Sequence, residues 1–415
     1  MTTEQTNAPA EPKAAEPVKD WASGYDIFDP EYVRDPYPIW DDLRQDCPIA
    51  HTERWGGSWM PTRYDDLFAI AQDWGSFSSR EILVAPIAPP PGAEAGEFYG
   101  VRAPPISSDP PEHTWARKLL LPHFSIKAVS VYEDETRELC RSLIDKFVAK
   151  GRADAAVDYA QQIPPRVIAS MLGVPHDMSD TFTGWVRNLL ELGLTNPELR
   201  GPARMELLTF LNNQIMARRN NPTDDLISKL LQAEVEGEPV SHIHLLGTCL
   251  LIVIAGIDTT WSSIGSALWH LAQHPYDRSV LIDRPEIIQN AVEELLRAYS
   301  PVTMARVTNR DIEYGGCPMK ENDRVLMNFP AANRDPAKFQ DPDKVVLDRE
   351  YNPHIAFGVG IHRCAGSNLA RMEMRVSIEE WLKRIPDFRL EDPSAVTWAG
   401  GQVRGPRNLP VIFAG

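Results

Sequence analysis

Hydrophobic residues recur three and four positions apart through most of the middle of the chain, with charged residues on the opposite face. This period matches one face of an α-helix and predicts amphipathic helices packed around a common core. The longest run, 241–274, is apolar over most of its first half, which indicates a buried helix. The predicted helices are 113–124, 125–150, 166–172, 180–194, 203–220, 241–274, 285–299 and 366–384.

Outside these helices the pattern changes to short apolar runs separated by Pro, Gly, Asn and Asp, typical of strands and turns. Such runs surround Gly57–Pro61, after a short helix predicted over Pro36–Gln45, and they recur beyond Pro301. The sequence therefore predicts a mainly α-helical domain with small β-sheets over 25–415. Residues 1–24 are rich in Pro, Ala, Glu and Lys, which predicts a disordered tail.

The segment from Ile82 to Pro111 contains the sequences APIAPPPGAEAG and RAPP. Repeated prolines exclude regular helix and central strand, because each one removes a backbone donor. A loop of this length inside a compact domain is either functional or disordered. We predict a lid over a binding site, with a passive surface loop as the alternative.

The formal net charge of the 415 residues is −16. An acidic surface repels nucleic-acid phosphates and anionic lipid, so neither partner is expected. The N-terminus lacks the basic start and apolar core of a secretion signal. The most apolar stretch, 243–257, is too short for a membrane span and is interrupted by His244. We expect a cytoplasmic protein that binds no membrane, and a monomer.

The chain has five cysteines, an odd number, and none stands in a CxxC pair, which argues against a disulfide framework. Cys364 differs from the others because it lies in FGVGIHRCAG, directly before the helix 366–384. A helix N-terminus supplies N–H donors and a positive dipole that lower the pKa of a thiol. The alternative is a cysteine buried by chance in a glycine-rich turn.

The neighbours of Cys364 suit a metal–thiolate bond. Gly358 and Gly360 permit a tight turn, and Gly366 permits the helix to pack closely behind it. Phe357 can shield the sulfur from water, which raises its electron donation to a metal. Basic residues follow at His362 and Arg363.

A second motif, AGIDTT, lies at 255–260 in the middle of the longest helix. Gly256 removes a side chain where a ligand needs room. Asp258 places a charge in an apolar run, which is costly unless the charge is paired or hydrated. Thr259 can bond back to a carbonyl four residues earlier and bend the helix. A surface acid beside a tolerated threonine is the alternative.

Together these motifs resemble those of the cytochrome P-450 family. The stretch 357–366 matches its FxxGxxxCxG haem-binding loop, and 255–260 is similar to its oxygen-binding AGxDTT motif. The resemblance covers the chain from about Asp26 to the end. It implies the cytochrome P-450 fold, a single domain shaped like a triangular prism, and a haem-thiolate monooxygenase with haem b held by Cys364 as axial ligand.

The resemblance also assigns roles to other residues. Thr259 would position oxygen over the iron, and Asp258 would gate delivery of the protons that the chemistry requires. The pair in EELLR and a third charge in LDRE would form a structural ion network of Glu294, Arg297 and Arg349. Besides Phe357, Gly358 and Gly366, the residues expected to contact haem are the propionate partners His113, Arg117, Arg306 and His362.

By the same resemblance, the substrate pocket is bounded by the loop 82–107, the helix region 180–194, the long helix and the turn at Gln402. The expected wall residues are Ile82, Leu83, Val253, Ile254, Gly256, Val302, Met304 and Val403. Their character suggests a small to medium, mainly apolar organic substrate, such as a terpenoid or small aromatic. Arg102 or Arg404 could instead recognise an anionic group.

The chain ends at Gly415 without a flavin or iron–sulfur segment. Electrons are therefore expected from NAD(P)H through a reductase and a separate ferredoxin. A local basic dock for that ferredoxin is predicted at Arg117, Lys118, Arg363 and Arg371, with ordinary surface charge as the alternative.

Two other functions compete with the monooxygenase. A haem-thiolate peroxygenase would use hydrogen peroxide directly, but it needs no proton relay of the kind that Asp258 and Thr259 imply. A non-catalytic haem-binding sensor or carrier would leave the relay without a purpose, and sensors usually carry an output domain.

Overall fold

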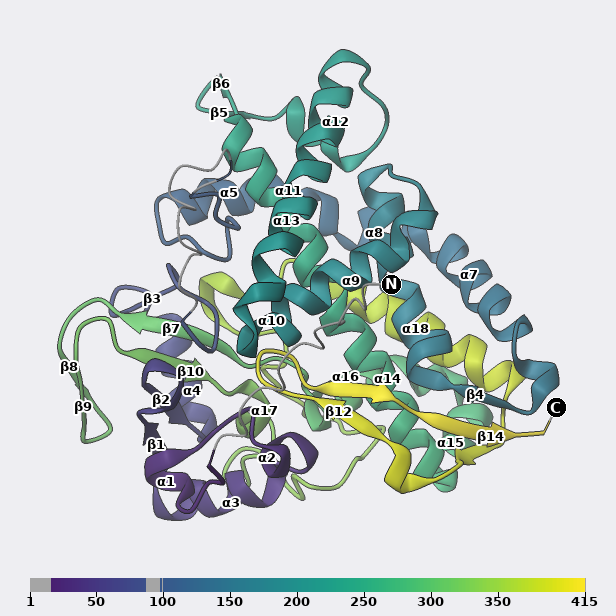
Figure 1. Ribbon diagram of the computed structural model, residues 1–415. Coiled ribbons are helices and arrows are strands. Elements are labelled where there is room, and N and C mark those ends of the chain that lie inside the picture. Colours follow the sequence, from purple (N-terminus) through teal and green to yellow (C-terminus); the bar gives the residue numbers. More distant parts are fainter. Residues whose placement is uncertain (1–15, 87–97, 99, 415) are drawn as a thin grey trace, which may run out of the picture.

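The computed structural model describes residues 16–86, 98 and 100–414 (Figure 1). Helices dominate it, and small sheets lie mainly toward one side and along the lower edge, so the predicted mainly α fold is confirmed. The predicted tail is too long at its C-terminal end. Helix α1 (Trp21–Gly24) begins within it, because Asp20 caps the helix and Trp21 packs on Tyr32. Residues 1–15 lie outside the described residues.

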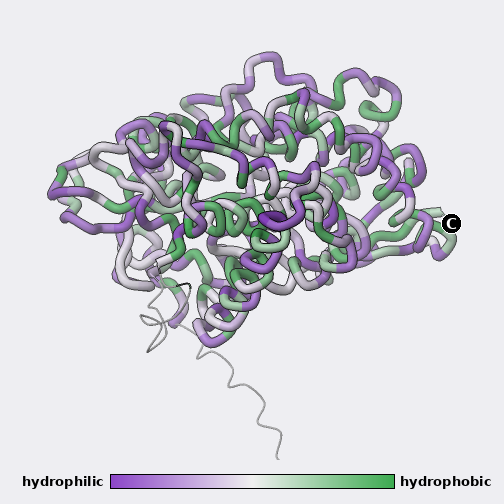
Figure 2. The backbone as a smooth tube through the Cα atoms, turned by 90° about the horizontal axis from the view of Figure 1, so that it is seen from above, coloured by the Kyte–Doolittle hydropathy of each residue, from purple (hydrophilic) through white to green (hydrophobic). Residues whose placement is uncertain are grey.

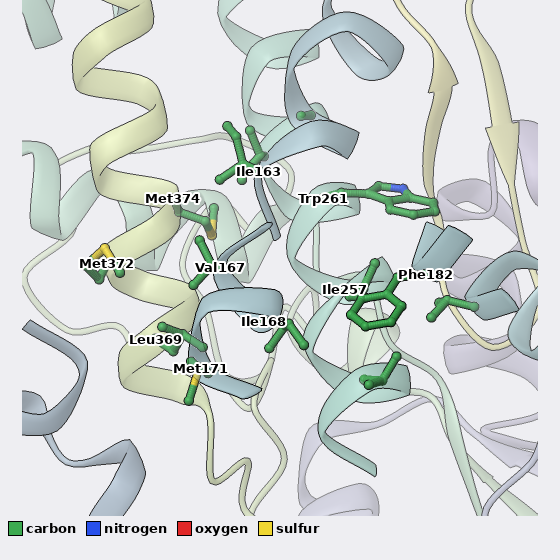
Figure 3. Packing of buried hydrophobic residues seen from close by; sticks show 14 of the residues in the cluster. Ile163, Val167, Ile168, Met171, Phe182, Ile257, Trp261, Leu369, Met372 and Met374 are labelled. Carbon is green, nitrogen blue, oxygen red and sulfur yellow. The ribbon is translucent and has the colours of Figure 1, made fainter. Parts of the chain in front are cut away.

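A layer of long helices surrounds the main core. Helix α18 (Ser367–Arg384) packs against α7 (Glu133–Asp145), α14 (Asp258–Gln273) and α16 (Ile288–Ala298). Helices α8 (Ile163–Leu172) and α13 (His242–Gly256) continue the same core. In Figure 3, Ile168 lies between the side chains of α18 and those around Ile257. Hydrophobic stretches run through the interior of the molecule, and the outer loops are hydrophilic (Figure 2).

The remaining helices are shorter or lie outside this layer. They are α2 (Pro30–Arg34), α3 (Tyr37–Asp46), α4 (Tyr64–Gln72), α5 (Glu112–Leu120), α6 (Ile126–Val129), α9 (Ser179–Leu190), α10 (Leu192–Thr195), α11 (Pro197–Asn220), α12 (Leu226–Leu231), α15 (Pro275–Asp283) and α17 (Phe329–Ala332).

Five strands form the largest sheet, in the order β1-β2-β10-β7-β3. A second sheet has the order β11-β14-β4, and three two-stranded pairs complete the set. The strands are β1 (Ile49–Thr52), β2 (Ser58–Pro61), β3 (Phe77–Ser78), β4 (Arg152–Asp154), β5 (Glu234–Val235), β6 (Glu238–Pro239), β7 (Met304–Thr308), β8 (Ile312–Tyr314), β9 (Cys317–Met319), β10 (Arg324–Met327), β11 (Phe388–Leu390), β12 (Thr397–Ala399), β13 (Gly405–Asn408) and β14 (Pro410–Phe413).

Several predicted helices are divided or extended in the structure. The segment 125–150 splits, because Ser125 caps α6 and turns of 3₁₀ helix separate it from α7. The segment 203–220 begins earlier, at Pro197, since proline fits the first turn of a helix. Helices α4, α12 and α15 and the short helices α1, α2 and α17 were not predicted at all. The segment 241–274 is interrupted at Ile257.

Of the helices in the described part of the chain, one run is long and apolar enough to cross a membrane. It spans His242–Gln273, and 72% of its most apolar window is buried inside the protein. The sequence predicted a buried helix here, and its residues pack in the main core.

An ion network ties α16 to the segment that leads to Cys364. Glu294 and Arg297 are fully buried and form two hydrogen bonds of 2.8 Å with each other. Arg349 donates to Glu294 at 2.9 Å, as does the backbone N–H of Val346. Arg297 also donates to three backbone carbonyls between 333 and 344. The three charges predicted to form a network therefore do meet, and they hold the chain between 333 and 349.

Replacing Arg297 with Met should destabilise the fold strongly. The substitution leaves the buried Glu294 carboxylate without its main partner, and breaking such a pair costs about 3–5 kcal/mol. Unfolding in urea measures the loss. The matched control is Lys320→Met, which breaks an exposed pair with Asp311, whose side chains are 70% and 64% exposed. That change should alter stability by less than about 1 kcal/mol; equal losses in the two variants would contradict a dominant role for the network.

Candidate functional site

The loop before α18 turns tightly beneath the main core. Gly358 and Gly360 have φ angles of +66° and +74°, which L side chains rarely adopt. A Cβ at Gly360 would lie 2.7 Å from the backbone oxygen of Ala71, so α4 leaves no room for a side chain there. The N–H of Cys364 donates to the carbonyl of Phe357 at 2.8 Å and closes the loop. The turn predicted from the glycines is thus present.

Gly366 plays a different part from the one predicted. A Cβ there would meet Phe124 and the Cys364 sulfur at 3.9 and 4.0 Å, which are ordinary contacts. Close packing within the protein therefore does not require glycine. Gly366 is instead the N-cap of α18, and its N–H is directed at Cys364, where it lowers the pKa of the thiol.

The Cys364 side chain is exposed, but the protein around it is dense. Desolvation raises its pKa, and this effect outweighs the Gly366 N–H and the charges of Arg117, Arg363 and Arg371, which lower it. The sequence predicted the opposite net direction, because it took account of the helix N-terminus and not of burial. A bound metal ion is what would keep this thiol deprotonated.

Four basic side chains gather near Cys364. The rings of His113 and His362 lie 4.4 Å apart between centroids. Burial and then the charge of Arg306 lower the pKa of His362 to about 2, and burial lowers the pKa of Arg306 to about 10. Arg117 completes the group and donates to the carbonyl of Arg363. Among the described residues, none of the four forms an ion pair with a carboxylate.

These groups fit a haem. The Nε2 atoms of His113 and His362 are buried and have no hydrogen-bond partner within the described structure. Buried polar atoms of this kind need a partner, and clustered positive groups need negative charge. Two propionates would satisfy both needs, with the iron toward the open sulfur of Cys364. The four residues predicted as propionate partners are therefore brought together.

The break at Ile257 separates α13 from α14 and places the second motif at the junction. The Thr259 hydroxyl donates to the carbonyl of Ala255 at 2.8 Å, the back-bond that the sequence suggested. Asp258 is fully buried, and desolvation raises its pKa despite the nearby guanidinium of Arg407. Ala255 is exposed although most of its helix is buried, so this face borders open space.

The cation that binds Asp258, and the second acid that the same cation binds, were missed by sequence reasoning. Arg407, on β13, donates to Asp258 Oδ1 at 2.8 Å and to Glu191 at 2.9 Å. Glu191, at the end of α9, has a lowered pKa because the charges of Arg407 and Arg187 outweigh its burial. A buried acid in an apolar helix indicates that a cation is near. The sequence could not indicate which one, since Arg407 is 149 residues away.

Some predicted pocket walls face protein instead of open space. Val253 is fully buried in the main core, and Val403 is buried beside its bridge to Val302. At Gly256 the space is already filled, because a Cβ there would lie 2.6 Å from Ile168. Half-buried side chains that keep some open surface are Ile82, Leu83, Ile254, Val302 and Met304.

The predicted lid lies partly outside the described residues, which lack 87–97 and 99. Its start is anchored, because Val84 donates to the Gln402 side chain at 3.0 Å. The two arginines considered for an anionic substrate are occupied. Arg102 pairs with Glu112, and Arg404 donates to the carbonyls of two residues in α2 and stacks on Trp398.

Comparisons with known proteins agree with this geometry. The sequence model of a family described as Cytochrome P450 matches residues 203–277 and 282–396. "Probable cytochrome P450 127A1" of Sinorhizobium fredii is 35% identical over 88% of this chain and 86% of its own. "Mycinamicin IV hydroxylase/epoxidase" of Micromonospora griseorubida is 34% identical over 90% of this chain and 94% of its own.

Solved structures give the same result. The cytochrome P450 PksS of Bacillus subtilis superimposes with a TM-score of 0.85 at 31% identity, covering 94% of this chain and all of that one. Cytochrome P450 CREJ, in complex with (4-ethylphenyl) dihydrogen phosphate, gives 0.86 at 28% identity, covering 94% and 99%. With a cysteine loop, a basic cluster and a broken long helix arranged as described, this chain belongs to the cytochrome P450 family of monooxygenases.

Proposed function

We propose that the chain inserts one oxygen atom from O₂ into a small to medium, mainly apolar organic molecule, with Cys364 as the iron ligand. The balanced reaction takes a substrate, O₂, two protons and two electrons to a hydroxylated product and water, or to the corresponding epoxide. When bound, haem b supplies the iron at which O₂ is activated. The observation that carries the proposal is the open sulfur of Cys364 beside four basic side chains that form no ion pair with a carboxylate among the described residues.

The residues around Cys364 would hold the cofactor. The sulfur lies at the N-terminus of α18, where helix dipole and the Gly366 N–H stabilise negative charge. His113, Arg117, Arg306 and His362 would neutralise the propionates. Haem contact by Phe357 and Gly358 stays a prediction of the sequence.

Asp258 and Thr259 would deliver protons. Asp258 Oδ1 is held by Arg407 and Ser262, whereas Oδ2 has no partner within the described structure. Its raised pKa lets the carboxyl hold a proton more readily than an ordinary aspartate. Thr259 donates its own proton to Ala255, so its oxygen is left to accept one. The reaction consumes two protons. The half-buried Thr259 lies one helical turn from the exposed Ala255, whereas Asp258 is fully buried.

The expected substrate class follows from the side chains that line the proposed pocket. The open side chains of that face and of the 302–304 segment are apolar, and Arg102 and Arg404 are already paired. We therefore favour a neutral substrate, although CREJ binds an aryl phosphate. Electrons would come from NAD(P)H through a reductase and a ferredoxin-type carrier, and a cytoplasmic monomer remains the expectation from the sequence.

The ligand assignment is tested by the carbon-monoxide difference spectrum of the reduced protein. Wild type should give the red-shifted Soret band of thiolate-ligated haem. Cys364→Ser should lose that band, because a serine hydroxyl is a far weaker donor to iron. The control Cys317→Ser, on β9, should keep it. A histidine-type spectrum in the wild type would refute the assignment.

The proton-delivery role is tested with Asp258→Asn. The amide cannot pass a proton, so O₂-dependent product formation should fall roughly 10²–10⁴-fold, the usual range for general acid–base groups. The solvent isotope effect on turnover should rise. The control is Asp277→Asn, which removes a half-buried acid on α15 that pairs with His270 of α14. It should change neither product formation nor the isotope effect.

A peroxide-driven reaction separates the monooxygenase from the peroxygenase. Hydrogen peroxide already carries the two protons and two electrons, so Asp258→Asn should leave peroxide-supported turnover much less affected. If wild type turns over equally well with peroxide alone and with NADH plus carriers, the result favours the peroxygenase and contradicts a proton-delivery role for Asp258 and Thr259.

The substrate class is tested by following the haem spectrum during titration. Neutral terpenoids and small aromatics should displace the iron-bound water and shift the Soret band at lower concentrations than matched carboxylates or phosphate esters. The reverse order would show that an anionic group is recognised.

A further inference from the structure

A second ion cluster lies on the Cys364 side of the core, next to the Glu294 network but separate from it. It consists of Glu293 on α16, Arg371 on α18 and His354 in the segment before Phe357, and we call it the proximal ion cluster. Arg371 forms two hydrogen bonds with Glu293, at 2.5 and 2.8 Å. His354 Nε2 lies 2.9 Å from the same carboxylate. Three separate elements thus meet at one acid.

The protonation state of His354 follows from its hydrogen bonds. The backbone N–H of Ala356 donates to His354 Nδ1 at 3.2 Å, so Nδ1 carries a lone pair and no proton. The ring proton therefore resides on Nε2, which donates to Glu293. His354 is a neutral donor in this arrangement. The cluster holds one anion and one cation. Burial alone would raise the pKa of Glu293, but the hydrogen bonds from Arg371 and His354 lower it to about 2.

The cation of this cluster lies against the loop that carries Cys364. The Arg371 guanidinium lies over the ring of Phe357, 4.5 Å from its centroid. Phe357 accepts the N–H of Cys364, so the stacked ring belongs to the same closed loop as the sulfur. Arg371 is also one of the charges that lower the pKa of Cys364.

We propose that Glu293 and His354 hold Arg371 as a stationary positive charge against the ring of Phe357. This charge weakens electron donation from the Cys364 sulfur and so raises the reduction potential of the haem iron. The proposal rests on the assignment of Cys364 as the iron ligand. Arg371 is a positioning residue in this scheme, since it acts through the sulfur.

The physical reason is that charge near a thiolate changes how much electron density it releases to the metal. A guanidinium on a free side chain would be hydrated and screened. Held by a bidentate carboxylate and covered by an aromatic ring, it keeps one position and loses part of its screening. A higher potential makes the first electron easier to accept from a carrier.

This arrangement also revises one prediction from the sequence. Arg371 was expected in a basic dock for ferredoxin, but its guanidinium is already bound to Glu293. An acidic partner would have to displace that carboxylate to use it. Arg117, Lys118 and Arg363 are not held in this way by a carboxylate in the described structure and stay candidates for the dock.

The experiment measures reduction potentials of the substrate-free holoprotein by dye-mediated titration. Arg371→Met removes the cation and leaves Glu293, so the potential should fall. Glu293→Gln removes the negative charge, while its amide oxygen can still accept a hydrogen bond from Arg371 and keep the guanidinium in place, so the potential should rise. Arg371→Lys keeps the charge and should lie nearer to wild type than Arg371→Met does. Opposite shifts of the reduction potential in Arg371→Met and Glu293→Gln would show that the cluster acts through its charges.

Arg375→Met is the matched control. Arg375 lies one turn further along α18, its side chain is 26% exposed against 25% for Arg371, and it pairs with Glu133 and Glu379. It is not among the charges that act most strongly on Cys364. Its loss should leave the potential unchanged. Haem content and melting temperature are recorded for every variant, and if Arg371→Met fails to hold haem, Glu293→Gln and Arg371→Lys still carry the test.

Two results would overturn the proposal. If Arg371→Met and Glu293→Gln shift the potential in the same direction, the cluster acts by holding the loop and excluding water. If Arg375→Met shifts it as much as Arg371→Met, the effect is not specific to this position. Failure of the ligand assignment is distinguishable, because wild type would then lack the thiolate-type carbon-monoxide spectrum before any variant is compared.

Discussion

The structure depends on holding a negatively charged Cys364 sulfur in a place where desolvation by the surrounding protein disfavours that charge. Desolvation raises the pKa of Cys364, so the ligand site works only if nearby positive groups and a metal ion together outweigh that cost. The N-terminus of α18, the Gly366 N–H and three arginines supply the protein's share. The loop that carries Cys364 is in turn closed through Phe357 and braced from α16. Much of the fold on this side of the core serves to hold one loop.

The group near Cys364 and the α13–α14 break both place charged side chains in low-solvent surroundings, positive ones in the first case and a negative one in the second. In the group of His113, Arg117, Arg306 and His362, positive side chains gather without an ion pair to a carboxylate among the described residues, and burial lowers the pKa values of Arg306 and His362. At the α13–α14 break, an acid is buried, and its pKa is raised although Arg407 is bound to it. Unpaired buried charge is costly. The first group therefore calls for an anionic cofactor, and the second holds a proton ready for transfer.

Neighbouring glutamates on α16 show how position decides the role of identical side chains. Glu294 lies in the fully buried network that holds the chain between 333 and 349. Glu293, one residue earlier, points to a different side of the helix and binds Arg371 and His354. Successive residues on a helix are about 100° apart, so one dipeptide can brace two segments. The sequence EELLR indicated the first role only.

Local sequence was enough for the mainly helical fold and the approximate places of most long helices, for the tight turn at Gly358 and Gly360, for the back-bond of Thr259 and for the motif that led to Cys364. Each of these depends on residues a few positions apart, where periodicity, backbone freedom and spacing are visible in the chain itself. The partners of Asp258, the filled space beside Gly256, the net rise in the pKa of Cys364 and the attachment of Arg371 to Glu293 depend on contacts between residues tens to hundreds of positions apart. Packing and desolvation depend on which residues the fold brings together, and no local sequence pattern shows which distant side chain will lie beside a given residue.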